Sequence, residues 1–143
     1  MPDVMTKKQR SYNMSRIRGK NTKPEELVRK YLFAQGFRYR KNDKCYPGKP
    51  DIVLPKYHTI VFVHGCFWHQ HPGCKAARIP ETNKKFWADK FEKNVRRDKA
   101  VKKQLEVMGW RVIVVWECEL SVKEKRETRL STLVEEIREY NLF

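Results

Sequence analysis

The stretch DIVLPKYHTIVFVH, residues 51–64, contains two short apolar runs separated by Pro55-Lys56-Tyr57-His58. Both runs, 51–54 and 59–64, are rich in β-branched side chains, which favour extended backbone. Two such runs joined by a short spacer that begins with proline are typical of a hairpin. We therefore predict two adjacent antiparallel strands, both apolar enough to be central in a sheet.

Two further segments have strand character. The run WRVIVVW, residues 110–116, is the most strand-like of the chain, and its continuous apolarity favours a buried central strand over an edge strand. Residues 37–40, FRYR, alternate between aromatic and basic side chains, which predicts a short strand with one solvated face. The prolines and glycine of residues 47–50 end that strand.

Three helices are expected around these strands. Residues 22–25, TKPE, have the form of a capping box with proline in the first turn, and Gly36 is a suitable helix stop. Residues 82–108 lack glycine and proline and repeat apolar side chains at helical spacing until Gly109. A third amphipathic pattern covers residues 130–140. The order of elements predicts a mixed α/β fold, with a central sheet flanked by helices.

Composition indicates a folded protein that binds a polyanion. The 143 residues include 32 Lys and Arg against 17 Asp and Glu, a formal charge of +15, together with 12% aromatic side chains. Nucleic acid is the natural partner of such a charge. We predict a basic N-terminal arm over residues 1–22 and a single domain over residues 23–143. The alternative for the arm is a solvated terminus without a binding role.

No segment approaches the run of about 20 apolar residues that spans a bilayer, and no apolar stretch of a signal peptide is present near Met1. A cytoplasmic protein without a membrane partner is therefore expected.

One loop combines cysteine and histidine in a metal-binding pattern. The spacing is C-x4-H-x2-C, and a further cysteine follows the strand-like run at 110–116. Three cysteines and one histidine are a usual closed set for structural zinc. His64 and His69 compete as ligands, and the alternative for each cysteine is an ordinary buried thiol. The candidate zinc ligands are Cys66, His71, Cys74 and Cys118.

A second metal site is suggested at Pro50-Asp51. An aspartate at the start of one hairpin strand, facing a second strand about a dozen residues later, is typical of PD-(D/E)xK nucleases, whose carboxylates hold Mg²⁺. Here the second position falls on residues 63–65, VHG, which offer no carboxylate or lysine. A backbone carbonyl can supply the missing oxygen ligand, and nearby histidines can transfer protons.

Motifs over most of residues 10–118 resemble the very short patch repair (Vsr) endonucleases. The matching motifs are PGKPD at 47–51, VHGCFWH at 63–69, Phe86-Trp87, Lys93-Asn94, Arg97-Asp98, GWRV at 109–112 and VWEC at 115–118. The resemblance implies a restriction-endonuclease-like fold, a variant of the PD-(D/E)xK type. It also implies Mg²⁺-dependent nicking of double-stranded DNA 5′ to the thymine of a T·G mismatch left by deamination of 5-methylcytosine.

The resemblance also assigns roles at the cleavage site. Asp51 and the backbone carbonyl of Val63 correspond to the Mg²⁺ ligands, His69 to the catalytic histidine, and His64 and Glu25 to its supporting groups. The structural zinc ligands of the family correspond to the four residues named above.

DNA recognition is assigned in the same way. Family residues that insert beside the mismatch correspond to Met14 in the arm and to Phe67, Trp68 and Trp87, and mismatch contacts correspond to Lys90 and Asn94. The spacing independently places Trp87, Lys90 and Asn94 on one helix face. Core packing is the alternative for the aromatic residues, although two adjacent aromatic side chains do not easily face one core. A solvated face is the alternative for Lys90 and Asn94.

Two other functions remain open on the sequence: a zinc-stabilised DNA-binding module without catalysis, and a restriction-type nuclease that cuts both strands of matched DNA. A monomer is expected, since a single mismatch is asymmetric. The resemblance further implies a bacterial protein, associated with the nucleoid when bound to DNA, and leaves other repair proteins open as partners.

Overall fold

Residues 22–139, the part of the chain that this computed structural model describes, contain four strands and three long helices. Short 3-10 turns η1 (Pro55–Tyr57), η2 (Lys75–Ala77) and η3 (Glu117–Leu120) connect some of them. The main elements are α2 (Lys23–Ala34), β1 (Arg40–Lys41), β2 (Ile52–Leu54), β3 (Thr59–His64), α3 (Lys84–Val107), β4 (Arg111–Trp116) and α4 (Lys123–Glu139).

The sheet has the order β1-β2-β3-β4. The predicted hairpin is confirmed, because β2 pairs antiparallel with β3 through Ile52 opposite Val61 and Leu54 opposite Thr59. β4 pairs with β3 in parallel, with His64 opposite Trp116 at the last position. A parallel pair needs a crossover connection, and α3 supplies it. The mixed α/β class is therefore confirmed.

The prediction of a central position for β4 is wrong. Within residues 22–139, β4 lies at the edge of the sheet, beside β3 alone. Its apolar run arises because helices cover both of its faces: Ile113 and Val115 pack into one core, and Val112 and Val114 into the other. Continuous apolarity thus reports burial on two faces and does not report the strand's position in the order.

The strand expected at residues 37–40 is shorter and later, and comprises only Arg40 and Lys41. Phe37 follows Gly36, which has a φ of +94°, and the chain turns there so that the Phe37 ring is buried against Tyr57, with the ring centroids 5.2 Å apart. Phe37 therefore packs in the core, and the strand begins three residues later, at Arg40.

The predicted helices form, and α2 and α3 have the expected ends, whereas α4 begins at Lys123, seven residues before the apolar pattern of residues 130–140. Thr22 caps α2, because its hydroxyl oxygen accepts a hydrogen bond from the backbone N–H of Glu25 at 3.4 Å. α3 is one helix of 24 residues, and Gly109 after it has a φ of +93°. These local signals act at the helix ends, where backbone groups need partners.

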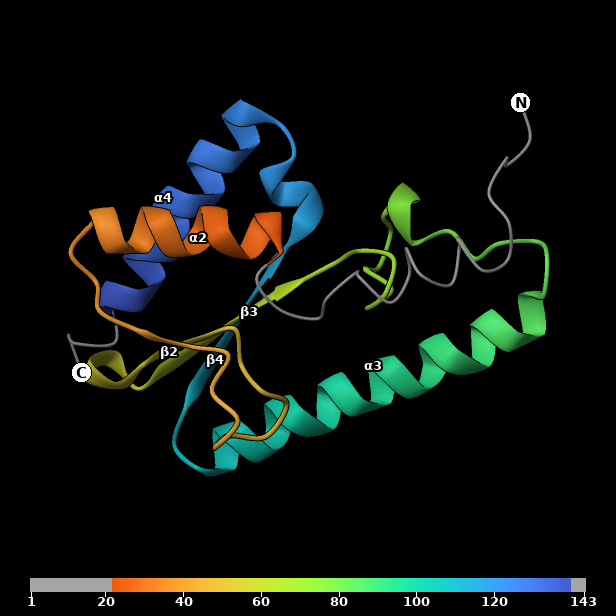
Figure 1. The fold of residues 1–143 in the computed structure, drawn as a ribbon, viewed down its shortest axis with the longest axis horizontal. Helices are drawn as coiled ribbons and strands as arrows, with labels where there is room; N and C mark the ends of the chain where they lie inside the picture. Colours follow the sequence, from red (N-terminus) through yellow and green to blue (C-terminus); the bar gives the residue numbers. More distant parts are fainter. Residues whose placement is uncertain (1–21, 140–143) are drawn as a thin grey trace.

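Two hydrophobic cores lie on opposite faces of the sheet. α2 and α4 cover one face and α3 covers the other (Figure 1). The core under α2 and α4 includes Val28, Leu32, Ile52, Leu54, Val61, Leu133 and Ile137, and the core under α3 includes Val53, Ile60, Phe62 and Leu105. Hydrophobic burial on both faces fixes the register of the strands.

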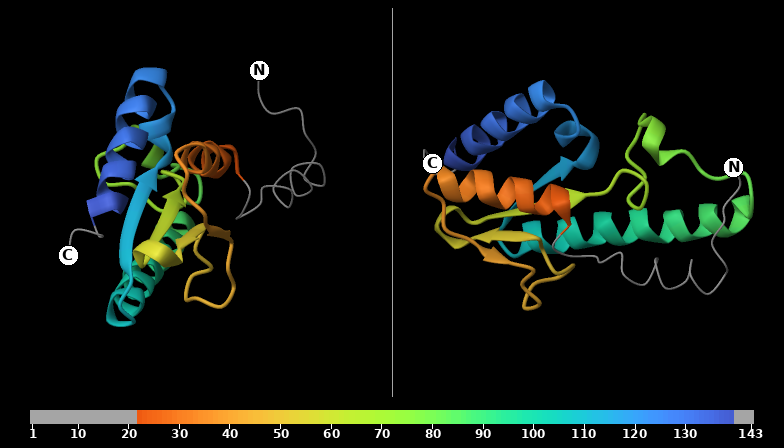
Figure 2. Two further views of the ribbon diagram at one scale, coloured as in Figure 1. Left: turned by 90° about the vertical axis from the view of Figure 1, so that its left-hand side faces the viewer. Right: turned by 45° about the horizontal axis from the view of Figure 1, so that its top comes forward.

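The N-terminal half of α3 extends past the end of the sheet, beside the segment of residues 65–83 (Figure 2). This half of the helix and that segment together form a lobe outside the two cores. Apart from Thr22, the predicted arm with Met14 lies outside the described residues, so the boundary at residue 22 stays a prediction. No described helix is long and apolar enough to cross a membrane.

The loop before Asp51 is pinned to α3 at one glycine. Gly48 has a φ of +75°, and a Cβ atom there would lie 2.6 Å from the Val101 side chain. Gly36 has a φ of +94° with nothing within 4 Å of the corresponding position. A side chain at Gly36 would therefore cause backbone strain alone, whereas a side chain at Gly48 would cause both backbone strain and a steric conflict with Val101.

We expect Gly48→Ala to lower the free energy of unfolding by about 2 kcal/mol or more, and Gly36→Ala by about 1 kcal/mol, the cost of a left-handed alanine alone. Urea denaturation measures both. Adding Val101→Ala to Gly48→Ala makes space for the methyl group, so the combined loss is expected to be smaller than the sum of the single losses. Equal losses at the two glycines, with additivity in the double variant, would contradict this account.

Candidate active site and metal centre

A cavity of about 590 Å³ opens where β3 and β4 end and α3 passes below them. Side chains from separate parts of the chain line it, including a carboxylate that precedes β2, a histidine from the end of β3, a histidine from the following loop and a carboxylate from α3. Among its lining residues are Asp51, Val63, His64, His69, Asp98 and Trp116. A concave site with several titratable groups is the usual form of an active site.

Asp51 is buried at the base of this cavity, with 7% of its surface exposed. Its Oδ2 accepts a hydrogen bond from the backbone N–H of Val63 at 2.7 Å. Burial, the nearby Glu25 carboxylate and a hydrogen bond with Glu25 raise the pKa of Asp51 to about 8, although the Val63 N–H and Arg29 oppose that rise. A buried carboxylate of this kind needs either a proton or a cation near it.

Glu25 is delivered by the first turn of α2 and has 2% of its surface exposed. Its Oε2 accepts a hydrogen bond from Nη1 of Arg29, one turn later, at 3.2 Å. The TKPE motif therefore does more than cap a helix: its glutamate brings a second carboxylate to Asp51 from the other layer of the fold. Once Asp51 loses its proton, two buried carboxylates with one guanidinium leave an excess of negative charge suited to a divalent cation.

His69 and Asp98 form a pair across the cavity. Nδ1 of His69 lies 2.7 Å from Oδ2 of Asp98, and both side chains are about one quarter exposed. A carboxylate at Nδ1 accepts the N–H there and leaves the lone pair of Nε2 free. His69 is thus held in the tautomer that can take a proton from water or, once charged, donate one.

His64 lies beneath His69, with the two rings stacked at 3.9 Å and 5°. Burial and the neighbouring His69 lower the pKa of His64 to about 4, although Asp98 opposes this, so the ring is neutral at pH 7. Imidazole lone pairs lie in the ring plane, and nearly parallel rings do not direct them at one ion. His64, His69 and Asp98 are close enough together for a metal, but this arrangement favours proton transfer instead.

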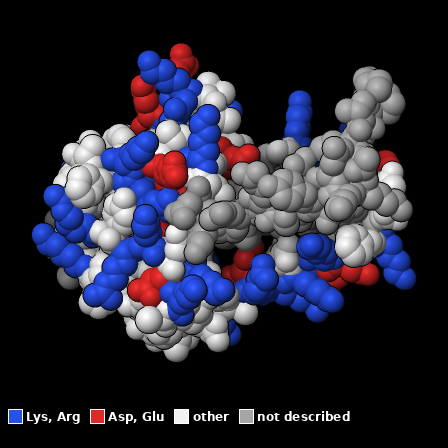
Figure 3. Space-filling view, in the orientation of Figure 1, with Lys and Arg blue, Asp and Glu red and all other residues white. Residues whose placement is uncertain are grey.

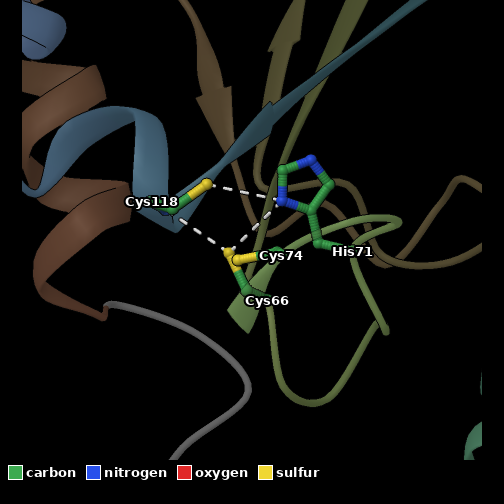
Figure 4. A group of neighbouring side chains, drawn as sticks. All are labelled: Cys66, His71, Cys74 and Cys118. Carbon is green, nitrogen blue, oxygen red and sulfur yellow. Dashed lines mark hydrogen bonds between the residues drawn. The ribbon is translucent and has the colours of Figure 1, made fainter. Parts of the chain in front are cut away.

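A second cluster lies beside the cavity, at the start of the 65–83 segment (Figure 4). Nδ1 of His71 is 3.7 Å from Sγ of Cys66 and 3.4 Å from Sγ of Cys118. All four predicted zinc ligands, Cys66, His71, Cys74 and Cys118, place their donor atoms within 4.8 Å of one another. Cys45 is exposed and lies outside this cluster.

These distances fit a tetrahedral metal ion. Zn–S and Zn–N bonds of about 2.3 and 2.0 Å at a tetrahedral angle separate sulfur from nitrogen by about 3.6 Å. The backbone N–H of Cys118 also points at Sγ of Cys66, at 3.4 Å. Hydrogen bonding from the Ala76 backbone lowers the pKa of Cys74, whereas burial raises that of Cys66 to about 12. Four protein ligands would leave no open coordination position, as is typical of structural metal sites.

The aromatic residues predicted for DNA recognition gather in the lobe at the N-terminal half of α3. Phe67 and Trp68 both contact the buried Phe91, with centroids 4.9 and 6.5 Å away, and Trp87 stacks on Phe91 at 5.6 Å. One small core therefore does accept two adjacent aromatic side chains, contrary to the argument from sequence. Phe67, Trp68 and Trp87 are nevertheless only partly buried, and Phe86 beside them is 60% exposed.

Lys90 and Asn94 lie on the same side of α3 as this cluster. Nζ of Lys90 is 5.4 Å from the Trp68 ring centre and 5.9 Å from that of Trp87. Nδ2 of Asn94 donates a hydrogen bond to the Trp68 carbonyl at 3.0 Å. Asn94 thus holds the aromatic loop against the helix, and the predicted single face is present.

Positive charge follows the length of α3. The helix carries nine Lys and Arg against four Asp and Glu, and blue side chains border its lower edge in Figure 3. Three of these cations line the cavity, and Lys49 from the loop before Asp51 joins them; all four are exposed: Arg97, Lys99, Lys102 and Lys49. Such a surface matches the phosphates of a nucleic acid.

The comparisons with known proteins agree with this geometry. The family model described as DNA mismatch endonuclease Vsr matches residues 2–75. A protein of Neisseria meningitidis serogroup A named type II nicking enzyme V.NmeAIP is 55% identical over 139 residues, which are 97% of this chain and 99% of that protein. This chain belongs to the Vsr family of DNA mismatch endonucleases.

Two further relatives carry similar names. Type II nicking enzyme V.XorIIP of Xanthomonas oryzae pv. oryzae is 43% identical over 94% of this chain and 98% of its own length. DNA mismatch endonuclease Vsr of Escherichia coli K12 is 42% identical over 87% of this chain and 80% of its own length. The resemblance to the Vsr family inferred from the motifs is therefore confirmed, and the chain is a nuclease.

Sequence reasoning missed four residues of this Vsr site. Asp98 belongs to the Arg97-Asp98 motif, and its position four residues after Asn94, on one helix face, links it to the site. Arg29 stands four residues after Glu25, the spacing of a helical ion pair. Phe91 stands four residues after Trp87 and therefore has the same spacing, whereas Trp116 carries no such local signal.

The cysteine cluster predicts metal content. We expect the purified Vsr chain to hold about one tetrahedral ion at Cys66, His71, Cys74 and Cys118, and Cys118→Ser to lose it. Because bound metal organises a loop with little apolar burial, the melting temperature should fall by about 10 °C. Elemental mass spectrometry and calorimetry measure these quantities. Cys45→Ser is the matched control and should change neither, and equal losses in both variants would contradict the assignment.

Asp51 predicts an unusual dependence of stability on pH. Its pKa rises from 3.8 to about 8 on folding, so the folded state binds the proton more tightly, and its contribution to stability is lost as pH rises through that window. Asp51→Asn stays neutral. In magnesium-free buffer we expect this variant to be more stable than the parent by about 2 kcal/mol at pH 9, with a smaller difference at pH 5.

Urea denaturation at each pH provides the measurement. Asp89→Asn, on the exposed surface of α3, is the control and should leave the pH profile parallel to that of the parent. A parallel profile for Asp51→Asn as well would show that Asp51 does not carry the buried charge.

Proposed function

We propose that this chain nicks one strand of duplex DNA 5′ to the thymine of a T·G mismatch left by deamination of 5-methylcytosine. The observation that carries the proposal is the buried Asp51, held by the Val63 N–H and paired with Glu25, in a cavity that also contains the His69–Asp98 pair. A carboxylate beside an oriented proton carrier is what phosphodiester hydrolysis requires.

Mg²⁺ is proposed as the catalytic ion, with Asp51 and the Val63 backbone carbonyl as its protein ligands. Hard oxygen donors suit Mg²⁺, and one or two carboxylates are its usual protein ligands. In an extended strand the N–H and C=O of one residue point to the same side, so the Val63 carbonyl lies on the side from which its N–H binds Asp51. The valine side chain offers no further ligand. When bound, Mg²⁺ supplies Lewis acidity and offsets negative charge on the scissile phosphate.

His69 is the proposed proton carrier. Asp98 accepts the Nδ1–H of His69 at 2.7 Å, which leaves Nε2 to take a proton from the attacking water or to deliver one to the leaving oxygen. Asp98 also stabilises the imidazolium that results. Products with a 3′-hydroxyl and a 5′-phosphate are expected.

His64 and Glu25 support this chemistry. The neutral His64 ring lies flat against His69 at 3.9 Å, so it restrains the second ring without adding a positive charge beside it. Glu25 adds negative charge at Asp51 and is itself fixed by Arg29. Together these contacts hold the reacting groups in place before DNA binds.

Zinc is proposed at the cysteine cluster as a structural ion. The set of three cysteines and one histidine is closed, so no position is left for water or substrate. Its role is to fold the loop that carries His69 and the aromatic residues.

The lobe at the N-terminal half of α3 is proposed to read the mismatch. Phe67, Trp68 and Trp87 are partly exposed and near enough together to enter a groove as one wedge. A T·G wobble weakens local stacking, so unstacking costs less there than at a matched pair. Lys90 and Asn94 lie beside the wedge, and Met14 is proposed to enter from the other groove. One copy of the chain suffices, because a T·G pair has no twofold symmetry.

The experiment uses duplexes labelled on either strand that differ at one pair, T·G or matched. They are incubated with the protein with or without Mg²⁺ and resolved on a denaturing gel. Cleavage of the thymine strand alone, with Mg²⁺ alone, is expected. Asp51→Asn should bind the T·G duplex but nick it at least about 100-fold more slowly, because the ligand for the charge-stabilising ion is lost. Asp89→Asn is the matched control and should nick normally.

Other outcomes would indicate a different function. Cutting of both strands in matched DNA would indicate a restriction-type nuclease. Tight binding without cleavage, across all flanking sequences tested, would indicate a DNA-binding module. Equal nicking by Asp51→Asn would remove Asp51 from the mechanism while leaving the activity itself in place.

A further inference from the structure

Trp116 joins the metal cluster to the cavity. It is the last residue of β4, lies opposite His64 in the parallel pairing with β3, and lines the cavity. Its backbone N–H donates to Oε1 of Glu119 at 2.7 Å, which closes the turn that carries Cys118. Its position is therefore tied to the sheet on one side and to the metal-ligand turn on the other.

The indole ring contacts one histidine from each site. It stacks on His71 of the metal cluster, with centroids 4.1 Å apart and planes 11° from parallel. It meets His64 of the cavity edge to face, at 5.2 Å and 73°. Since His64 stacks in turn on His69, four rings form one continuous series from the cluster to the proton carrier: His71, Trp116, His64 and His69.

His64 lacks the hydrogen bond that usually orients a histidine. Its Nδ1 is buried and has no hydrogen-bond partner among the residues that the structure describes. His69, by contrast, is oriented by Asp98. The ring contacts of His64 are therefore its main restraint, and besides His69 they come from Phe62, at 5.7 Å, and Trp116. Of these two, Trp116 is the nearer.

We propose that Trp116 is a positioning residue that sets the orientation of the His64 ring. Through Trp116, the metal cluster fixes the positions of the His64 and His69 rings in the nuclease centre. The proposal deepens the proposed function and rests on it for the effect on nicking. Its structural part concerns His64 and His71 alone and can be tested without DNA.

Loss of the indole should affect both neighbours. Without Trp116, His64 gains room to turn, and the face of His69 loses its fixed neighbour. His71 loses the ring that holds it in the ligand geometry, and partners of metal ligands typically change metal affinity about 10-fold or more. DNA contacts in the aromatic lobe are not touched, so binding should change little.

The test uses full-length, metal-loaded protein with isotope-labelled histidine. The His64 ring signal is assigned with His64→Gln and compared by NMR among the parent, Trp116→Leu and Trp116→Phe. In Trp116→Leu the His64 signal should shift and broaden, because the ring current is lost and the ring reorients. In Trp116→Phe it should shift but stay narrow, because a smaller ring still restrains it.

Trp110→Leu is the matched control. Trp110 precedes the opposite end of the same strand, is similarly half-buried and contacts Tyr46 and His58 instead. Its replacement should leave the His64 signal and the nicking rate unchanged, whatever it does to the free energy of unfolding. A similar His64 change in Trp110→Leu would mean that general loosening of the fold explains the result, and would overturn the proposal.

Two solution measurements complete the test. Trp116→Leu should lower the single-turnover nicking rate about 10-fold or more, with the Kd for the T·G duplex changed less than about twofold, and Trp116→Phe should recover most of the rate. Trp116→Leu should also release metal to a chelator about 10-fold faster, while still holding one ion per chain as purified.

The outcomes separate the proposal from the function on which it rests. If the parent does not nick the T·G duplex, the proposed function fails, and the NMR comparison still decides the role of Trp116. An unchanged His64 signal in Trp116→Leu overturns the proposal. If Trp116→Leu does not fold, Trp116→Phe decides: an unchanged His64 signal there overturns it, and a shifted narrow signal supports it.

Discussion

The fold is organised around a carboxylate that is costly to bury. Asp51 lies below the surface. It accepts a hydrogen bond from one backbone N–H of β3, and the Glu25 carboxylate of α2 lies close to it. The central hairpin and the helical layer that contains α2 bring these groups together. The hydrophobic cores on the two faces of the sheet must offset the unfavourable free energy of this arrangement. The proposed cation at the same place would relieve it, so the occupied site would be more stable than the empty one.

The segment of residues 64–71 supplies three neighbouring sites in turn. His64 and His69 face the cavity, Cys66 and His71 belong to the metal cluster, and Phe67 and Trp68 join the aromatic lobe. Apart from Phe67 and Trp68, which pack on Phe91, the side chains of residues 65–71 bury little apolar surface, so hydrophobic burial contributes little to ordering the rest of this segment. A metal ion at the proposed cluster would order it, and would order all three sites at once.

Much of the fold could be predicted from local signals. The β-branched runs predict the hairpin, Thr22 predicts the start of α2, and Gly36 and Gly109 predict where helices end. The position of β4 in the sheet could not be predicted. The apolar side chains on its two faces indicate that helices cover both faces, but they do not indicate which strands lie beside it. For the site, motif and spacing located Asp51, His69 and the cysteine cluster. The spacing of Asp98 from Asn94 indicates a shared helix face. Which face of α3 meets the cavity is a tertiary property, however, and no local pattern places Trp116 in the site.

The central claim is that a cation held by Asp51 contacts the scissile phosphate. Sulfur substitution at either non-bridging oxygen of that phosphate, in a T·G duplex, tests it most directly through the single-turnover nicking rate. Since sulfur is a poor ligand for Mg²⁺ and a better one for Mn²⁺, one diastereomer should react at least about tenfold more slowly with Mg²⁺ and recover with Mn²⁺. An equal effect of sulfur with both ions would contradict direct contact and with it the proposed role of Asp51.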